Sequence, residues 1–247
     1  MGARSIVASM RRVVTPAVAG AAAIPLALLT VVTLRWSALH WGATTEECRE
    51  ELPGDGLIRD PGLVATRAIT IHAPPEQVWP WVVQLGADRG GFYSYDRLEN
   101  LAGCGVRSAD TVVEEWQHLD VGDPVHLHPK VALSVASVDP VHSLVLHAGP
   151  VLSGAGAPPG AGGAAPEAAP HDFTWAFVLR RHPHRATRLI VRERFAYTHP
   201  WSFLLVEPVS AASSAMSRQM LHGIRDRAER AFAVTIPDLL LRQGALR

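Results

Sequence analysis

The sequence places one carboxylate, that of Glu193, at a position where a protein core is expected. In the strand predicted at 187–197, alternation places Glu193 on one face with three apolar side chains, Leu189, Val191 and Phe195. The other face carries three arginines, Arg188, Arg192 and Arg194. A carboxylate among apolar neighbours needs a partner or a raised pKa. Glu193 is therefore a candidate for orienting a polar ligand group or for general-base chemistry, and pairing with an inward Arg, His or Tyr is the structural alternative.

A second polar group follows the glycine pair at 90–91. Tyr93, Tyr95 and Asp96 lie at the start of a short helix predicted at 93–101, where they can close the mouth of a cavity. The glycines permit a hinge or a close backbone approach. The alternative is that Tyr93 and Asp96 cap and anchor this helix.

Apolar candidates come from three elements. A predicted strand at 172–181 carries an aromatic stripe that includes Trp175 and Phe177, and a helix predicted from residue 75 carries Trp79. A long helix predicted at 209–232 carries Met216 and Met220 on its apolar face. Such stripes are typical of a core, and in a hollow sheet they also line a ligand site. With the polar residues above, they complete the predicted ligand-contact set.

Several classes of function find no support in the sequence. The 12 histidines include His126 and His128 on one face of a strand, but neither HExxH nor a cysteine pair accompanies them, so we predict no metal. GxSxG, phosphate-loop and dinucleotide motifs are absent, and we predict no cofactor. The formal net charge is zero, and arginines of the last helix alternate with acids, so we expect no nucleic-acid binding.

The elements that position these residues follow a simple order. A strand at 63–73 precedes the two helices, and short strands are predicted at 123–128, 132–138 and 142–147. Two long strands and the C-terminal helix complete the chain. This order predicts an α+β fold in which a curved antiparallel sheet wraps around the long helix, leaving space for a ligand between them.

At several points the sequence resembles the START-like superfamily, also called SRPBCC or helix-grip proteins. The matching stretches are AITIHAPPEQVWPWV (68–82), GGFYSYDRLENL (90–101), DFTWAFVL (172–179), TRLIVRERF (187–195) and MSRQMLHGIRDRAE (216–229). The resemblance covers about residues 63–232 and points to a membrane-associated, Trp-rich subgroup. It implies a cavity-containing fold shared by lipid carriers and polyketide cyclases, among others, and does not imply one reaction.

The N-terminus reads as a membrane anchor. Residues 13–34 contain no charged side chain and are long enough to span a bilayer, and Trp36 and Trp41 follow as interfacial residues. The alternative is a cleaved signal peptide, although the apolar run exceeds the usual length of one. Three arginines at positions 4, 11 and 12 favour a cytoplasmic N-terminus and an extracytoplasmic domain in the cell membrane.

The remaining divisions follow from composition. Residues 1–12 form a basic N-terminus, 35–62 a linker, 63–235 the ligand-binding domain and 236–247 a C-terminal tail. Within the domain, the Gly-, Ala- and Pro-rich residues 151–170 predict a disordered loop. Cys48 and Cys104 are expected as two free thiols, with a disulfide as the alternative.

The leading function is non-catalytic binding of a lipid, isoprenoid or polyketide-like molecule beside the membrane. An enzyme of the cyclase or dehydratase type is the first alternative, with Glu193, Tyr95 or Asp96 as acid or base. An interaction module with a fully packed interior is the second. The sequence leaves the ligand and the oligomeric state open.

Overall fold

The computed structural model describes residues 26, 29–101, 103–148, 172–197 and 203–244. The predicted anchor at 13–34 and the predicted loop at 151–170 therefore lie largely or wholly outside the described residues. Within the described ranges, no helix is both long enough and apolar enough to cross a membrane.

A six-stranded antiparallel sheet is the centre of the domain, with strand order β1-β6-β5-β4-β3-β2. Its strands, all antiparallel to their neighbours, are β1 (Leu63–Ile71), β2 (Pro124–His128), β3 (Val131–Asp139), β4 (Ser143–Ala148), β5 (Phe173–His182) and β6 (Ala186–Phe195). Register shifts interrupt the β2–β3 pair between His126 and His128 and the β3–β4 pair between Val135 and Ser137. Such bulges increase the local twist, and they occur at the β2 end of the sheet.

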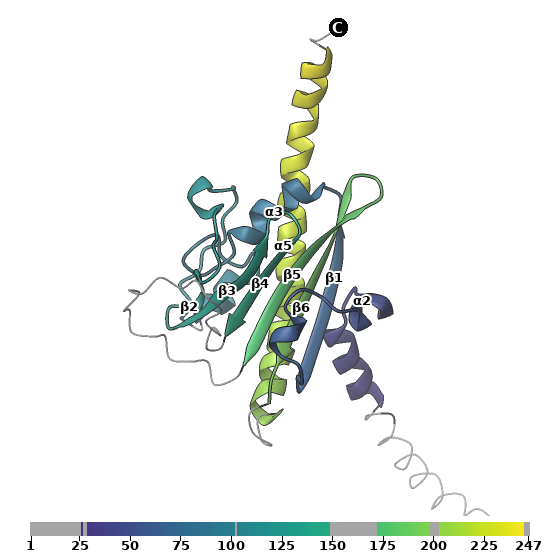
Figure 1. Cartoon of the computed structure of the whole chain (residues 1–247), viewed down its shortest axis with the longest axis vertical. Helices are drawn as coiled ribbons and strands as arrows, with labels where there is room; N and C mark the ends of the chain where they lie inside the picture. The colour runs from purple at the N-terminus through teal and green to yellow at the C-terminus, as the bar shows by residue number, and fades with distance from the viewer. Residues whose placement is uncertain (1–25, 27–28, 102, 149–171, 198–202, 245–247) are drawn as a thin grey trace, which may run out of the picture. The chain divides into compact units, whose positions relative to one another are not determined.

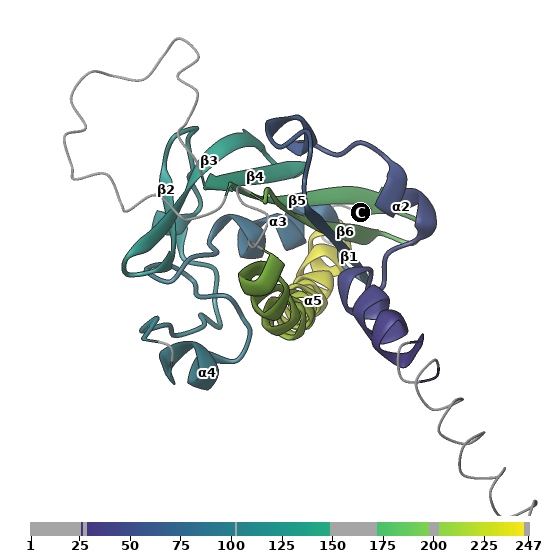
Figure 2. The same ribbon diagram turned by 90° about the horizontal axis from the view of Figure 1, so that it is seen from below.

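The helix α5 (Phe203–Gly244) lies across one face of the sheet (Figures 1 and 2). Helix α3 (Pro75–Val83) covers the same face, and both helices contribute to the main apolar core. Met220, Leu221, Ile224 and Ala228 of α5 are buried there, and Met220 was placed on the apolar face by the periodicity of the sequence. The α+β fold with a C-terminal helix packed on an antiparallel sheet is therefore confirmed. Helix α5 continues to Gly244, so the predicted tail is helical up to that residue.

The short helices complete the domain. Helix α4 (Asp96–Leu101) and the 3-10 turn η2 (Glu114–Trp116) lie between α3 and β2 in the chain. Helix α2 (Thr45–Arg49) and the 3-10 turn η1 (Asp55–Leu57) precede β1 and had no counterpart in the sequence prediction. Thr44 and Glu47 form a capping box at the start of α2, the local signal that fixes this helix in a Gly- and Pro-rich stretch.

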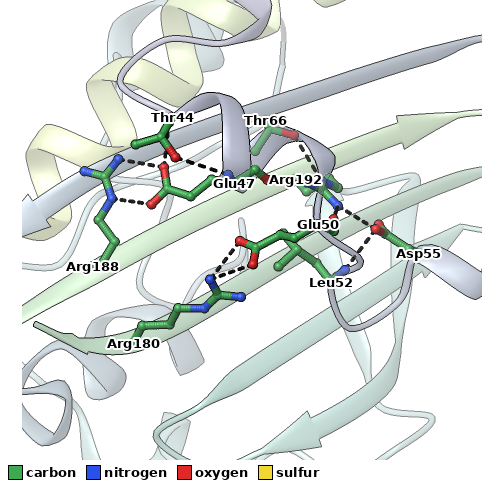
Figure 3. Close-up of polar contacts among 9 residues, drawn as sticks. All are labelled: Thr44, Glu47, Glu50, Leu52, Asp55, Thr66, Arg180, Arg188 and Arg192. Carbon is green, nitrogen blue, oxygen red and sulfur yellow. Dashed lines mark hydrogen bonds and ion pairs between the residues drawn. The ribbon is translucent and has the colours of Figure 1, made fainter.

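Residues 42–58, called here the outer segment, pack on the face of the sheet opposite α5 (Figure 3). Leu52 packs there against Ala68, Val178 and Ile190. Part of the predicted linker is thus an integral layer of the domain.

The arginines on the outer face of β6 hold this segment. Arg188 makes two hydrogen bonds to the Glu47 carboxylate, from Nε at 2.7 Å and from Nη2 at 2.8 Å, and they hold the pKa of that carboxyl below its ordinary value (Figure 3). Arg192 is 2% exposed and donates to Asp55 Oδ2 at 2.5 Å and to the main-chain oxygen of Glu50 at 2.8 Å. Arg188 and Arg192 on this face of the sheet are thereby covered by the outer segment and paired with its carboxylates.

Replacement of Arg192 by Met should lower the free energy of unfolding by about 3 kcal/mol, because buried oxygens of the outer segment lose their donor. Denaturant unfolding of the variant checks this. Arg181→Met is the matched control: the Arg181 side chain is 71% exposed, pairs with Glu76, and should cost about 0–1 kcal/mol. Equal losses in the two variants would contradict the role assigned to Arg192.

Candidate functional site

A pocket of about 330 Å³ lies between the sheet, α4 and the first half of α5. Its wall is mainly apolar and is formed by Phe92, Ser94, Glu99, Cys104, Leu127, Phe173, Trp175, Glu193, Ser213, Met216, Ser217 and Met220. The volume falls in the range of small-molecule sites, about 300–1,000 Å³. Four of the predicted ligand-contact residues are in this wall: Glu193, Trp175, Met216 and Met220.

Glu193 faces the pocket and is paired. The Glu193 Oε1 atom lies 3.0 Å from Nη1 of Arg67, and the two side chains are 2% and 0% exposed. Ser217 Oγ donates to the same carboxylate at 2.8 Å, and Ser213 Oγ lies 3.4 Å from each of its oxygens. The structural alternative of the sequence analysis, pairing with an inward arginine, is thus what the structure shows.

Alternation along β1 explains how Arg67 reaches this position. Ala65 pairs with Glu193 across the β1–β6 ladder, and Arg67 lies two residues along on the same inner face. On α5, Ser214 accepts a hydrogen bond from Arg67 Nη2 at 2.7 Å and donates to the main-chain oxygen of Ser210 at 2.7 Å. Arg67 was not predicted as a site residue, although alternation along β1 places it on the same face as Ala65 and Ile69.

Glu99 is a second carboxyl in the pocket wall and was not predicted. It is 2% exposed on α4, and within the described ranges neither carboxyl oxygen has a hydrogen-bond partner. Burial raises the pKa of Glu99 to about 7, the Asp96 carboxylate adds to the rise, and Ser94 opposes it. Sequence periodicity gave a weak signal, since an acid three residues after Asp96 in a short helix lies close to it.

Aromatic rings form much of the remaining wall. The Trp175 ring centroid lies 4.8 Å from that of Phe177 and 6.4 Å from that of Phe92. Trp175 Nε1 is buried and has no hydrogen-bond partner among the described residues. Phe177 is fully buried behind Trp175 in the core, outside the pocket wall. Trp79 is likewise a core residue of α3 and is not in the wall.

Tyr93, Tyr95 and Asp96 line a separate, polar groove rather than the apolar pocket. Asp96 accepts hydrogen bonds from the main-chain nitrogen of Ser108 at 2.9 Å and from Ser108 Oγ at 2.6 Å. Tyr93 is 2% exposed, and its hydroxyl accepts a hydrogen bond from Gln84 Nε2 at 2.8 Å. Desolvation by burial raises the pKa of Tyr93 strongly. These contacts support the anchoring alternative for Tyr93 and Asp96.

The close backbone approach expected at the glycine pair occurs: an added Cβ would lie 2.7 Å from the main-chain oxygen of Gln84 at Gly90 and 2.8 Å from the Cα of Ser108 at Gly91. A Cβ added to Gly223 of α5 would lie 2.2 Å from the main-chain oxygen of Tyr93. Tyr93 itself has a positive φ of 56°, which is rare for a residue other than glycine. Segment 92–94 is therefore fixed backbone-to-backbone against α5.

The histidines and cysteines take part in no cluster within the described residues. His126 Nδ1 lies 2.9 Å from Asp88 Oδ2, and His128 Nδ1 accepts from the main-chain nitrogen of Lys130 at 3.1 Å. No group of three or more His, Cys, Asp and Glu side chains in the described ranges is arranged to hold a metal ion. Cys48 and Cys104 are both free thiols, and Cys104 belongs to the pocket wall.

Comparison with known proteins finds similar chains among the solved structures. No family model matches the sequence, and no curated protein matches it. Protein MLL2253 of Mesorhizobium loti is similar at 15% identity over 68% of this chain and 98% of its own, with a TM-score of 0.37. Protein Ms6760 of Mycobacterium smegmatis is similar at 16% identity over 65% of this chain and 89% of its own, with a TM-score of 0.34.

The Polyketide_cyc-like protein Cgl2372 of Corynebacterium glutamicum is similar at 13% identity over 71% of this chain and 93% of its own, with a TM-score of 0.31. The helix-grip arrangement that the resemblance implied is the one described above, an antiparallel sheet against a long C-terminal helix.

Glu193→Gln should lower the free energy of unfolding by about 3–5 kcal/mol, because the Arg67 guanidinium would remain buried without its counter-charge. Addition of Arg67→Met should restore much of the loss by removing that charge. Chemical denaturation of wild type, single and double variants measures the coupling. A double variant no more stable than the single one would argue against this pairing.

Glu99→Gln should stabilise the fold in a pH-dependent way. The raised pKa means that the folded chain binds this proton more tightly than the unfolded chain, so ionisation costs stability as pH rises from about 4.5 to about 7. We expect no effect near pH ~4 and a gain of about 2 kcal/mol near pH ~8, read from unfolding at both. Glu115→Gln, at an exposed position, is the control. A gain independent of pH would contradict the buried-acid assignment.

Proposed function

We propose that the domain binds an apolar small molecule, a lipid, isoprenoid or polyketide-like compound, in the pocket between sheet and α5. The observation that supports this most directly is the pocket itself: about 330 Å³ lined mainly by aromatic and aliphatic side chains. A fully packed interior, which the interaction-module hypothesis required, would leave no such space.

Two buried polar side chains in the pocket wall indicate which polar substituents the ligand should carry. The carboxyl oxygens of Glu99 and the indole nitrogen of Trp175 are buried without hydrogen-bond partners among the described residues. An unsatisfied buried polar group costs about 1–3 kcal/mol. A ligand that supplies a donor to Glu99 and an acceptor to Trp175 would recover part of that free energy, so we infer an apolar body with polar substituents.

A membrane location remains part of the proposal on sequence grounds. Residues 13–34 have the length and composition of a spanning segment, and the basic residues before them favour an extracytoplasmic domain. Tethering would place the pocket near the phase into which apolar molecules partition.

A catalytic function of the cyclase or dehydratase type is the second candidate. One observation favours it: Glu99, with a pKa of about 7, can both give and take a proton near neutral pH. Tyr95 and Asp96 line the polar groove, which leaves Glu99 and Glu193 as the acids of the pocket. Chemical conversion of the bound molecule during incubation would distinguish an enzyme from a carrier.

Native mass spectrometry with solvent extraction, on full-length protein from its own host, tests ligand binding directly. We expect an adduct of lipid-like mass that is lost on denaturation. Met216→Trp should remove the adduct because the larger side chain fills the pocket. Ala215→Trp adds the same side chain at an exposed position of α5 and should retain it. Protein that carries no adduct and also binds none of a panel of lipids and polyketides would overturn the proposal.

A further inference from the structure

The pocket wall holds two carboxyl groups, those of Glu193 and Glu99. Among the described residues, a positively charged side chain pairs with Glu193 alone. Glu193 is neutralised by Arg67 at 3.0 Å. Glu99 is as deeply buried, at 2% exposure, and among the described residues no cation pairs with it and neither carboxyl oxygen has a hydrogen-bond partner of ordinary geometry. A lone buried carboxylate is unfavourable unless it is protonated or meets a positive charge.

The groups around Glu99 do not supply that charge. On α4, the Asp96 carboxylate disfavours ionisation of Glu99, and Ser94 partly offsets this. After α4, the Cys104 thiol has a raised pKa through its own burial and through Glu99. From the other elements the wall presents Leu127 of β2, Glu193 of β6, and Ser213, Met216, Ser217 and Met220 of α5. The Arg67 guanidinium is already committed to Glu193.

The remaining wall suits a cation. Phe92, Phe173 and Trp175 contribute aromatic rings to the same pocket. The faces of such rings attract ammonium groups by about 0.5–2 kcal/mol, and more strongly when water is excluded. Aromatic rings and an ionisable carboxyl in the wall of one mainly apolar pocket are groups that both favour a positively charged guest.

We propose that the ligand carries a protonated amine on its apolar body and that this amine pairs with Glu99. The inference deepens the proposed function and rests on it. The amine would provide the counter-charge that the described residues lack, while the apolar body contacts the rings and methionines. Ligands with a hydroxyl in place of the amine would instead select the protonated form of Glu99.

This difference sets the sign of the pH dependence. Alkylamines stay protonated across neutral pH, like the lysine side chain. Glu99 loses its proton around pH 7. Amine affinity should therefore rise from about pH 6 to about pH 8, whereas affinity for a neutral alcohol should stay level or fall.

The test compares octylamine, octanol and octanoate, which share one chain length, by titration calorimetry on full-length protein prepared without alkyl-chain detergent. We expect octylamine to bind most tightly, and Glu99→Gln to weaken it about tenfold or more while changing octanol less than about twofold. Glu115→Gln removes the same charge from an exposed position and should change neither affinity.

The outcomes separate the two proposals. Octanol binding as tightly as octylamine, or amine affinity that falls with rising pH, would overturn the amine inference and leave ligand binding intact. Binding of none of the three probes by the wild-type chain, together with no adduct on the host-purified protein, would overturn both.

Discussion

The buried pair of Arg67 and Glu193 constrains three elements at once. Both side chains are almost fully excluded from water, and either one alone would be an uncompensated charge in the core. The pair joins adjacent strands β1 and β6 on their inner face, and the serines of α5 complete its hydrogen bonds. A shift of one residue in the β1–β6 register would turn Arg67 to the outer face, so the pair also specifies the register. Helix α5 is thereby positioned over the end of the sheet where the pocket lies.

Charged side chains have different kinds of partner on the two sides of the sheet. The outer face of β6 carries several arginines, and the outer segment neutralises them with carboxylates and main-chain oxygens (Figure 3). On the pocket side, the described residues include the Arg67–Glu193 pair of the sheet and an acid of α4, Glu99, whose carboxyl oxygens have no hydrogen-bond partner. Natural proteins retain such unsatisfied buried groups mainly where they serve a function. The contrast within one domain is therefore a reason to look for function at Glu99.

Much of the architecture was predictable because it follows from periodicity. Alternation in β6 placed Glu193 inward and Arg188 outward, and the helical stripe of α5 placed Met220 in the core. The outer segment was not predicted because its stability comes from ion pairs to distant strands rather than from a local pattern. Glu99 was missed for a related reason: its burial depends on how α4 packs, which a six-residue helix does not encode in its own sequence. Tyr93 and Asp96 were predicted at the mouth of the cavity and line a separate polar groove instead, where hydrogen bonds with Gln84 and Ser108 hold them; spacing along the chain does not reveal such partners.

The contact between Gly223 and Tyr93 has a consequence for the shape of the molecules that can be accommodated. Because the two backbones touch there, α5 and segment 92–94 cannot move closer together. Phe92 and Ser94 of this segment and Met216 and Met220 of α5 belong to the pocket wall, so the main chains on this side of the pocket set a minimum width. The wall also includes Leu127, which lies in the edge strand β2 at its register shift. A guest molecule thinner than the minimum width would leave part of the pocket unfilled, so packing should favour a body of matching thickness.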